Sequence, residues 1–364
     1  MKDKSKQSRG HSLNGNGKLT AIDLFSGCGG LTVGLKIAGF RILGAVEVDP
    51  LSVMTFKANH HGVEVWEMDI RELEPTELLE KFGLQGGELD LLAGCPPCQG
   101  FSTMRTLNGA VKVMDSRNDL LLEFQRFVEV IRPRAVMMEN VPGLADDERF
   151  EVFCRKMKKL GYLGDYRILN VAEYGVPQRR SRLIYLAGAG MKIPFADKAV
   201  RRSTVKKAIG RLPNAGESGD PMHDMPEHRT PKVMAIIKQI PKNGGSRRDL
   251  PDHLQLECHK RCNGFKDVYG RMAWNDVAPT ITSGCFNPSK GRFLHPEEDR
   301  AITLREAALL QGFPRRYKFP INNKSAVALM IGNALPPPFI AAHGKSIREA
   351  LQDNGGTQPI HKRD

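Results

Sequence analysis

The sequence lacks the features that mark membrane, secreted or repeat proteins. We find no apolar run that approaches the length of a membrane span, and the first six residues lack the apolar core of a signal peptide. The seven cysteines are an odd number without framework spacing, which suits a reducing compartment better than a disulfide-bonded scaffold. We also find no internal repeat. These absences predict a cytoplasmic protein with no membrane partner.

The chain does have length and positive charge. With 364 residues, of which 40% are hydrophobic and 26% charged, it can bury a large core and is long enough for two domains. Lys and Arg number 54 against 41 Asp and Glu, which gives a net charge of +13. Residues 191–271 hold 17 basic and 9 acidic residues, so they carry +8 of this charge. A segment this basic favours a polyanionic partner such as nucleic acid, and a solvated basic surface is the common alternative.

Strand and helix patterns alternate from residue 19 to residue 187. The alternation predicts a doubly wound, mostly parallel α/β sheet. We expect strands over residues 19–25, 41–48, 63–66, 89–93, 134–138, 166–172 and 183–187, and helices over residues 31–38, 50–59, 118–131 and 150–160. The alternation ends at Gly188, after which the chain is rich in proline, glycine and basic residues to about residue 269. Helical patterns return over residues 303–311 and 336–351.

Residues 94–99, Gly-Cys-Pro-Pro-Cys-Gln, follow a predicted buried strand, where open α/β sheets place their sites. The glycine and the prolines stop the strand and present Cys98 on a stiff turn. Cys95 and Cys98 have the spacing of a redox pair, but such a pair opens a helix, and here Gly100 follows almost at once. A metal site needs a second pair, which only residues 258–262 offer, so we expect no metal. The segment alone leaves a nucleophile, a redox pair and a buried thiol open.

A glycine-rich turn, residues 25–30, joins the first predicted strand to a helix. Glycines let the backbone approach a ligand closely, and a helix N-terminus favours negative charge. The dinucleotide fingerprint is incomplete, since Thr32 stands in place of its third glycine. Glu47 ends the second strand, where such folds place a ribose-binding carboxylate, and Asp69 ends the third. Together these residues predict a nucleoside cofactor, although acidic residues are also ordinary turn residues at strand ends.

Glu139 and Asn140 end the fifth predicted strand, on the sheet edge that carries Cys98. A carboxyl group that burial keeps protonated can donate a proton to a ring nitrogen. A capping turn before Pro142 is the alternative interpretation.

Gln178, Arg180 and Arg182 alternate along a segment that we expect to be extended, so their side chains share one face. Arginines in this arrangement can bind a carbonyl oxygen or a phosphate. The alternative is an edge strand that charge protects from aggregation.

Five motifs in order resemble those of the C5-cytosine DNA methyltransferases of prokaryotic restriction-modification systems. They are residues 23–30 (Asp-Leu-Phe-Ser-Gly-Cys-Gly-Gly), 97–99 (Pro-Cys-Gln), 139–141 (Glu-Asn-Val), 178–182 (Gln-Arg-Arg-Ser-Arg) and 332–335 (Gly-Asn-Ala-Leu). The resemblance runs from about residue 19 to residue 351 and is interrupted by the basic segment. It implies the S-adenosylmethionine-dependent methyltransferase fold with a second, smaller, irregular DNA-recognition domain. It also implies S-adenosylmethionine as methyl donor and a cytosine flipped out of a specific double-stranded DNA sequence.

The resemblance implies a role for each catalytic residue. Cys98 would add to C6 of the cytosine, and Glu139 would hold and protonate N3. Arg180 or Arg182 would bind O2, and Asn140 would order the loop around the thiol. Because C5 is a poor nucleophile until addition at C6 breaks the aromaticity of the ring, the reaction needs a group such as a thiolate that adds reversibly.

The resemblance also implies the residues that bind the cofactor and the DNA. Phe25 would pack on the adenine, Glu47 would bind the ribose hydroxyls, and Asp69 with Ile70 would bind the adenine edge. The whole cofactor set comprises Phe25, Gly27, Gly29, Gly30, Leu31, Glu47, Val48, Asp69, Ile70, Pro97, Leu120, Asn333, Ala334 and Leu335. The DNA-binding set comprises Gln99, Ser102, Gln178, Arg271 and Thr280. In one departure from the family pattern, Leu335 stands where Val is more frequent.

We expect five segments: a disordered basic tail (1–17), a catalytic and cofactor-binding domain (18–189), a target-recognition domain with its connection (190–325), a C-terminal segment that returns to the catalytic domain (326–352) and a flexible tail (353–364). The loop over residues 100–116 would close on the DNA once a base is flipped. We expect a monomer, with a restriction endonuclease of the same DNA site as a candidate partner. Two alternatives stay open: a methyltransferase of RNA (tRNA) cytosine C5, and a DNA-binding regulator on an inactive methyltransferase scaffold.

Overall fold

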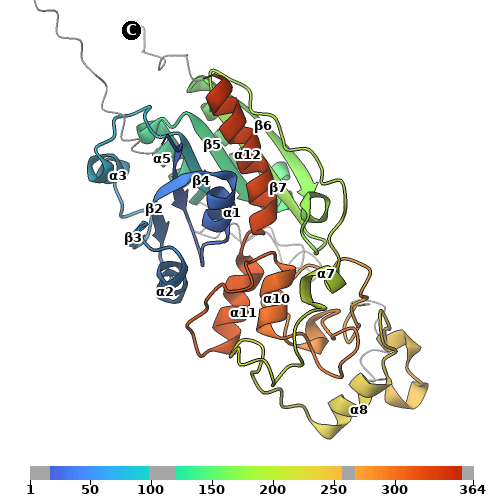
Figure 1. Ribbon diagram of the computed structural model, residues 1–364. Coiled ribbons are helices and arrows are strands. Elements are labelled where there is room, and N and C mark those ends of the chain that lie inside the picture. The colour runs from blue at the N-terminus through green and yellow to red at the C-terminus, as the bar shows by residue number, and fades with distance from the viewer. Residues whose placement is uncertain (1–16, 98–119, 256–266, 355–364) are drawn as a thin grey trace, which may run out of the picture.

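The structure, a computed structural model, describes residues 17–97, 120–255 and 267–354. A seven-stranded sheet of order β3-β2-β1-β4-β5-β7-β6 forms its centre (Figure 1). The strands are β1 (Thr20–Leu24), β2 (Arg41–Glu47), β3 (Glu64–Glu67), β4 (Leu91–Gly94), β5 (Ala135–Asn140), β6 (Tyr162–Asn170) and β7 (Ser181–Ala189). Strands β1 to β5 are parallel, and β7 is antiparallel to both β5 and β6. The predicted mostly parallel, doubly wound sheet is confirmed.

Successive residues of each strand point to opposite sides of the sheet, so both faces carry apolar side chains. Helices cover both faces and bury these side chains. Ile22 and Leu92 lie in a core with three of the helices, α3 (Pro75–Phe82), α5 (Leu120–Ile131) and α6 (Glu148–Lys159). Ala21 and Leu91 face a second core, formed with α1 (Gly30–Ala38) and the last helix, α12 (Pro337–Asp353). Helix α2 (Pro50–Asn59) follows β2.

Helices α1 and α12 lie side by side although they come from opposite ends of the chain (Figure 1). Two glycines allow the close approach. A Cβ atom at Gly34 would lie 2.6 Å from Cγ2 of Ile340, and one at Gly344 would lie 2.7 Å from Cβ of Ala38. The C-terminal segment is thereby fixed beside the glycine turn that precedes α1.

The described residues of 200–333 form a second lobe, which lies below the sheet in Figure 1. Its helices are α7 (Val205–Ile209), α8 (Pro231–Gln239), α10 (Leu304–Leu310) and α11 (Lys324–Asn333). The main core of this lobe includes Phe293, Phe313 and Val327, and Cys28 and Val33 from the first part of the chain join it. The two lobes therefore share buried contacts at the glycine turn.

Several elements differ from the sequence predictions. The strand expected over residues 166–172 begins earlier, at Tyr162, and residues 171–174 form a 3-10 helix instead. Strand β7 pairs on both sides, so the hypothesis of a charge-protected edge strand around residues 178–182 is wrong. Helices α3, α7, α8 and α11 were not predicted.

One stretch, Lys324–Asp353, is long and apolar enough to cross a membrane by length and composition, which corrects the prediction that no run approaches that length. It comprises two helices, α11 and α12, separated by residues 334–336. Of its most apolar window, 61% is buried inside the protein, as expected for core helices.

Candidate active site

A cavity of about 660 Å³ opens at the carboxyl ends of the central strands. The glycine turn after β1, the end of β2 and the segment after β4 line one part of it, together with the end of β5. The second lobe and the start of the C-terminal segment close it through residues 280–283 and 332–335. Segments that are far apart in the sequence thus meet around one space.

Most of the predicted cofactor residues line this cavity. They are Phe25, Gly27, Gly30, Leu31, Glu47, Val48, Asp69, Ile70, Pro97, Leu120, Asn333, Ala334 and Leu335. Gly29 is not among the lining residues; it is the N-cap of α1 and has a left-handed backbone with φ of 95°. The structure brings Glu139, Asn140, Arg180 and Arg182 to the same cavity, whereas Cys98 lies outside the described residues.

A further group of residues lines the cavity, some inside the quoted motifs but none assigned a role from the sequence. They are Ser26, Cys28, Val46, Asp49, Leu51, Ser52, Met68, Cys95, Pro96, Val141, Ile281, Thr282, Ser283, Ala326, Leu329, Met330 and Gly332. Many are neighbours of predicted residues and could have been found by extending each motif. Residues 281–283 and 326–330 carried no such signal, because only the packing of the second lobe brings them here.

The glycine turn is held open by Glu47. Its Oε2 accepts a hydrogen bond from the backbone N–H of Gly27 at 2.7 Å, and its Oε1 accepts from Val48 and Asp49 at 2.9 Å each. Burial raises the pKa of Glu47, and these three N–H donors partly oppose the shift. Each carboxylate oxygen can accept more than one hydrogen bond, so Glu47 can hold the turn and still accept from a ligand. Phe25 adopts a positive φ of 60°, which is rare for a residue other than glycine.

Glu139 and Arg182 form a buried ion pair at the other end of the cavity. The distance from Arg182 Nε to Glu139 Oε1 is 2.8 Å, and the two side chains are 16% and 8% exposed. Burial raises the pKa of the Glu139 carboxyl group, while Arg182 and then Arg180 act in the opposite direction. The net shift of the pKa is upward, which is the direction that a carboxyl group needs if it is to act as an acid.

Asn140 links the end of β5 to the segment that leads to Cys98. Its Nδ2 donates to the carbonyl oxygen of Pro96 at 2.9 Å, and its Oδ1 accepts from the backbone N–H of Val141 at 2.8 Å. This amide therefore fixes the backbone two residues before Cys98.

Arg180 is buried and joins the first part of the chain to two segments of the second lobe. Its Nη1 donates to the carbonyl oxygens of Ile281 at 3.0 Å and Gly332 at 2.8 Å. Gln178 is fully buried beside it, where it donates to Gln311 and accepts from the N–H of Ile281. The alternating residues of this motif thus hold the cavity walls together.

Of the predicted DNA-binding residues, Gln178, Arg271 and Thr280 lie among the described residues. Arg271 is fully buried, and its guanidinium donates to the carbonyl oxygens of Ile237, Ile240, His295 and Glu298 and to the carboxylate of Asp299. Arg271 and Gln178 are both buried, and their hydrogen bonds join segments within the second lobe and between it and the first part of the chain. A contact of either residue with DNA stays a prediction. Thr280 is exposed at the cavity, and Gln99 and Ser102 lie outside the described residues.

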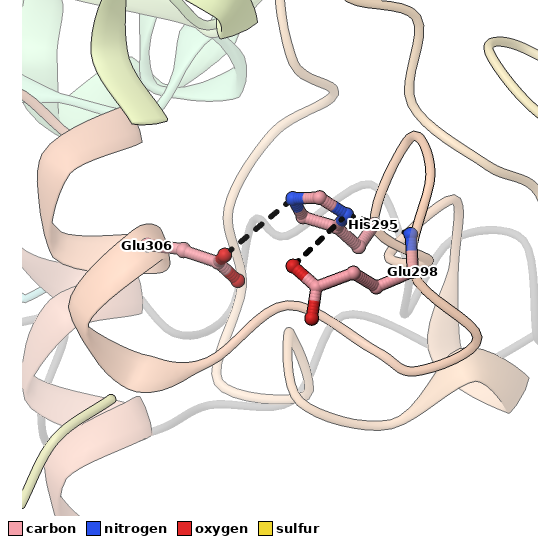
Figure 2. Close-up of side chains that lie close together, drawn as sticks. All are labelled: His295, Glu298 and Glu306. Atoms are coloured by element: carbon pink, nitrogen blue, oxygen red, sulfur yellow. Dashed lines mark hydrogen bonds and ion pairs between the residues drawn. The ribbon is translucent and has the colours of Figure 1, made fainter. Parts of the chain in front are cut away.

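His295, Glu298 and Glu306 are close enough to resemble a metal site, with the imidazole between the two carboxylates (Figure 2). However, His295 Nδ1 already accepts from the backbone N–H of Glu298 at 3.0 Å. Arg300 donates to both oxygens of Glu306 at 2.8 Å and pairs with Glu298 as well. Since one guanidinium already binds both carboxylates, we interpret the cluster as an ion-pair network that attaches residues 293–300 to α10.

The chain belongs to the C-5 cytosine-specific DNA methylase family, whose model matches residues 19–349. It is 37% identical to the type II methylase M.HgiDII of Herpetosiphon aurantiacus, over 91% of this chain and 95% of that one. It is 34% identical to the type II methyltransferase M1.HphI of Haemophilus parahaemolyticus, over 90% of this chain and 86% of that one. A crystal structure of an E. coli prophage protein described as a DNA modification methyltransferase matches with a TM-score of 0.67 and 26% identity, covering 92% of this chain and all of that one.

The resemblance found in the motifs is therefore confirmed, and the chain is a DNA cytosine-5 methyltransferase. Family and fold together imply the use of S-adenosylmethionine. The comparisons do not reach individual residues, so the roles of the site residues remain predictions.

Proposed function

We propose that the chain transfers a methyl group from S-adenosylmethionine to C5 of a cytosine flipped out of a specific double-stranded DNA sequence, through a covalent bond between Cys98 and C6. One observation carries the proposal. A single cavity joins the glycine turn with Glu47, which suits a nucleoside, to the buried Glu139 and Arg182, which suit a pyrimidine ring.

The residues at the glycine turn fit S-adenosylmethionine. Phe25 offers an aromatic face for the adenine, and Glu47 offers carboxylate oxygens for the ribose hydroxyls. The hydroxyl of Ser26 lines the cavity and is buried without a hydrogen-bond partner among the described residues, as expected where a ligand completes the site. When bound, S-adenosylmethionine supplies an electrophilic methyl group on a sulfonium.

The residues at the other end fit a flipped cytosine. A protonated Glu139 can donate to N3, and a guanidinium can donate to O2. Arg182 is already beside Glu139, and the buried Nε–H of Arg180 has no acceptor among the described residues. Both arginines line the cavity, and either can serve as the donor to O2.

The protein groups carry out the following steps. The Cys98 thiolate forms a bond to C6, and the displaced electron pair develops on the ring as Glu139 gives its proton to N3. C5 would then have enamine character, so it could form a bond to the methyl group as the methyl–sulfur bond breaks and S-adenosylhomocysteine leaves. A base removes the C5 proton, the S–C6 bond breaks, the N3 proton returns to Glu139, and Cys98 leaves as a thiolate. Asn140 positions the backbone before Cys98 throughout.

Bisulfite sequencing of a plasmid from cells that express the chain is the first test. We expect protected cytosines within one short sequence, which would identify both the reaction and the recognition site. If the protein binds S-adenosylmethionine but no cytosine of the plasmid is protected, the assignment of DNA as substrate is contradicted. The same assay would then be applied to tRNA.

A mechanism-based trap tests the covalent step. In a substrate with 5-fluorocytosine at the target position, fluorine cannot leave C5 as a proton does, so the S–C6 bond should persist and survive denaturation. Cys98→Ser should bind the DNA and the cofactor but form no such complex. A stable complex with the Ser variant, or methyl transfer near the wild-type rate, would remove Cys98 from the mechanism.

We also propose that residues 18–189 form the catalytic part and residues 190–325 recognise the target, with the protein acting as a cytoplasmic monomer beside a restriction endonuclease of the same site. The separate hydrophobic core of residues 236–294 in the second lobe supports an independent recognition element. Helix α11 packs in the second lobe, so we place the return of the chain to the catalytic part at α12.

A further inference from the structure

A chain of buried hydrogen bonds reaches the glycine turn without lining the cavity. His60 follows α2, and Tyr317 follows α10 in the second lobe; each residue is 4% exposed. The Nε2 atom of His60 lies 3.0 Å from the hydroxyl of Tyr317. The hydroxyl of Tyr317 in turn bonds to the backbone carbonyl oxygen of Cys28, in the middle of the turn.

The direction of these bonds is fixed by the groups at either end. Lys36 Nζ has only hydrogens to offer, so Nδ1 of His60 must accept from it at 3.3 Å. Burial, assisted by the charge of Lys36, lowers the pKa of His60 to about 3, so the ring is neutral and carries its single proton on Nε2. This N–H donates to the Tyr317 oxygen, and the ring also bonds to the backbone of Gly29 in the turn. The Tyr317 hydroxyl proton is then left for the carbonyl oxygen of Cys28, which can only accept.

The packing leaves these two side chains little freedom. A Cβ atom at Gly29 would clash with the His60 ring and would lie 2.7 Å from the Tyr317 oxygen, so only glycine fits between them and the turn. The Tyr317 ring packs against Phe313 and Phe319, with ring centroids 4.7 and 5.4 Å apart. The hydroxyl is therefore aimed at the turn by a rigid aromatic cluster.

The same turn is held from the cavity side by Glu47, which accepts from the N–H of Gly27. Cys28 itself lines the cavity, and its thiol lies 3.7 Å from the carbonyl oxygen of Met330 in α11. A shift of the Cys28 carbonyl would therefore move a wall of the cofactor site. It would also disturb the packing of Cys28 in the core of the second lobe, which Val33 of α1 joins as well.

We infer that Tyr317 is a positioning residue for S-adenosylmethionine: its hydroxyl, oriented by His60, holds the glycine turn in the shape that the cofactor binds. The inference rests on the proposed function, since it takes the cavity at this turn as the cofactor site. It assigns to the second lobe a part in cofactor binding in addition to DNA recognition.

The test compares Tyr317→Phe with wild-type protein by calorimetric titration with S-adenosylhomocysteine and by steady-state kinetics. Loss of one buried hydrogen bond of this kind should raise the Kd of the cofactor product, and the KM for S-adenosylmethionine, about three- to tenfold. We expect kcat and the KM for DNA to stay within about twofold, because Tyr317 touches neither the cytosine nor the reacting atoms.

Tyr162→Phe is the matched control. Tyr162 is equally buried, and its hydroxyl also donates to a backbone carbonyl, that of Pro133 at 2.7 Å, outside the cavity. We expect it to lower Tm as much as Tyr317→Phe does, with the Kd unchanged. A wild-type Kd in Tyr317→Phe, or equal Kd changes in both variants, would overturn the inference. Failure of the wild-type protein to bind S-adenosylhomocysteine would instead contradict the proposed function.

A second pair of variants carries the test if Tyr317→Phe does not fold. His60→Gln keeps an N–H for the Tyr317 oxygen and an acceptor for Lys36, whereas His60→Leu keeps neither. We expect the Leu variant to bind S-adenosylhomocysteine at least threefold more weakly than the Gln variant. Equal affinity of the two variants would contradict the role of the hydrogen-bond chain.

Discussion

Replacement of Glu139 by Gln tests the chemistry of the cavity most directly. The amide has nearly the same shape, its oxygen can still lie beside Arg182, and its N–H can still donate to N3 of a bound cytosine. What it lacks is a proton that can be transferred. Binding should therefore survive while the chemical step is lost.

The magnitude follows from the position of the carboxyl group. Glu139 is 7% exposed, so water cannot readily replace it as the proton donor. A positioned general acid contributes about 10²- to 10⁴-fold to a rate, so kcat should fall by that factor, equivalent to about 2.7–5.4 kcal/mol of transition-state stabilisation. The KM for DNA should change only a few-fold.

The pH dependence gives a second criterion. Because burial raises the pKa of Glu139, its protonated form is retained to a higher pH than in a free carboxylic acid and is lost as the pH rises through that value. The wild-type rate should accordingly show an alkaline limb that is absent from Glu139→Gln, whose amide does not titrate.

Single-turnover transfer of a labelled methyl group, measured across pH at saturating DNA and cofactor, is the appropriate assay. Glu173→Gln is a suitable control, because it alters a carboxylate that pairs with Lys198 at 3.1 Å and lies outside the cavity. A rate for Glu139→Gln within tenfold of wild type, or an alkaline limb that persists in the variant, would refute the role of Glu139 as the acid.

Three further variants test other parts of the structure. Burial raises the pKa of Asp23 from 3.8 to about 7, so the folded state loses stability as the pH rises between these values. The stability gained by Asp23→Asn should therefore grow over this interval, to roughly 4 kcal/mol at most. A gain in Tm that is independent of pH would contradict this. A Cβ at Gly30 would lie 2.5 Å from the carbonyl oxygen of Leu335, so Gly30→Ala should weaken cofactor binding about tenfold or more by titration, while Gly86→Ala, with its nearest neighbour at 3.5 Å, should not. Arg271→Lys removes the planar guanidinium that donates to five acceptors. It should lower the free energy of unfolding by about 3–5 kcal/mol in urea titrations. Unchanged stability would show that the buried contacts are unimportant.

The sheet was predictable because its strands are short apolar runs, such as Leu91 and Leu92 of β4, separated by glycine turns and amphipathic helices. Helix α3 was missed although its sequence carries a capping box of Glu74 and Glu77. Helices α7 and α8 lie in the stretch rich in proline, glycine and basic residues, where periodicity is weak, and α11 lies beyond it, after residue 269. Their positions depend on packing that no local pattern records.

The candidate site was predictable where local motifs end strands, as with Glu47 and Glu139. The wall of the cavity formed by residues 281–283 was not predictable, because these residues reach the cavity only through tertiary contacts such as that of Arg180 with Ile281. For Arg271, the local sequence suggested a role that takes no account of its buried position in the fold. A basic residue in a basic segment suggests a contact with DNA, yet its acceptors come from separate segments that only the folded lobe brings together.

The pairing of α1 with α12 has a consequence for the order in which the protein becomes functional during synthesis. The cavity that we propose for the cofactor has residues 332–335 as one of its walls, and α12, which follows them, packs on α1. A nascent chain that has reached the end of β7 can form the sheet and the glycine turn but has no complete cavity. If the cofactor binds in this cavity, ribosome-bound or truncated forms that end before α11 should be unable to bind the methyl donor.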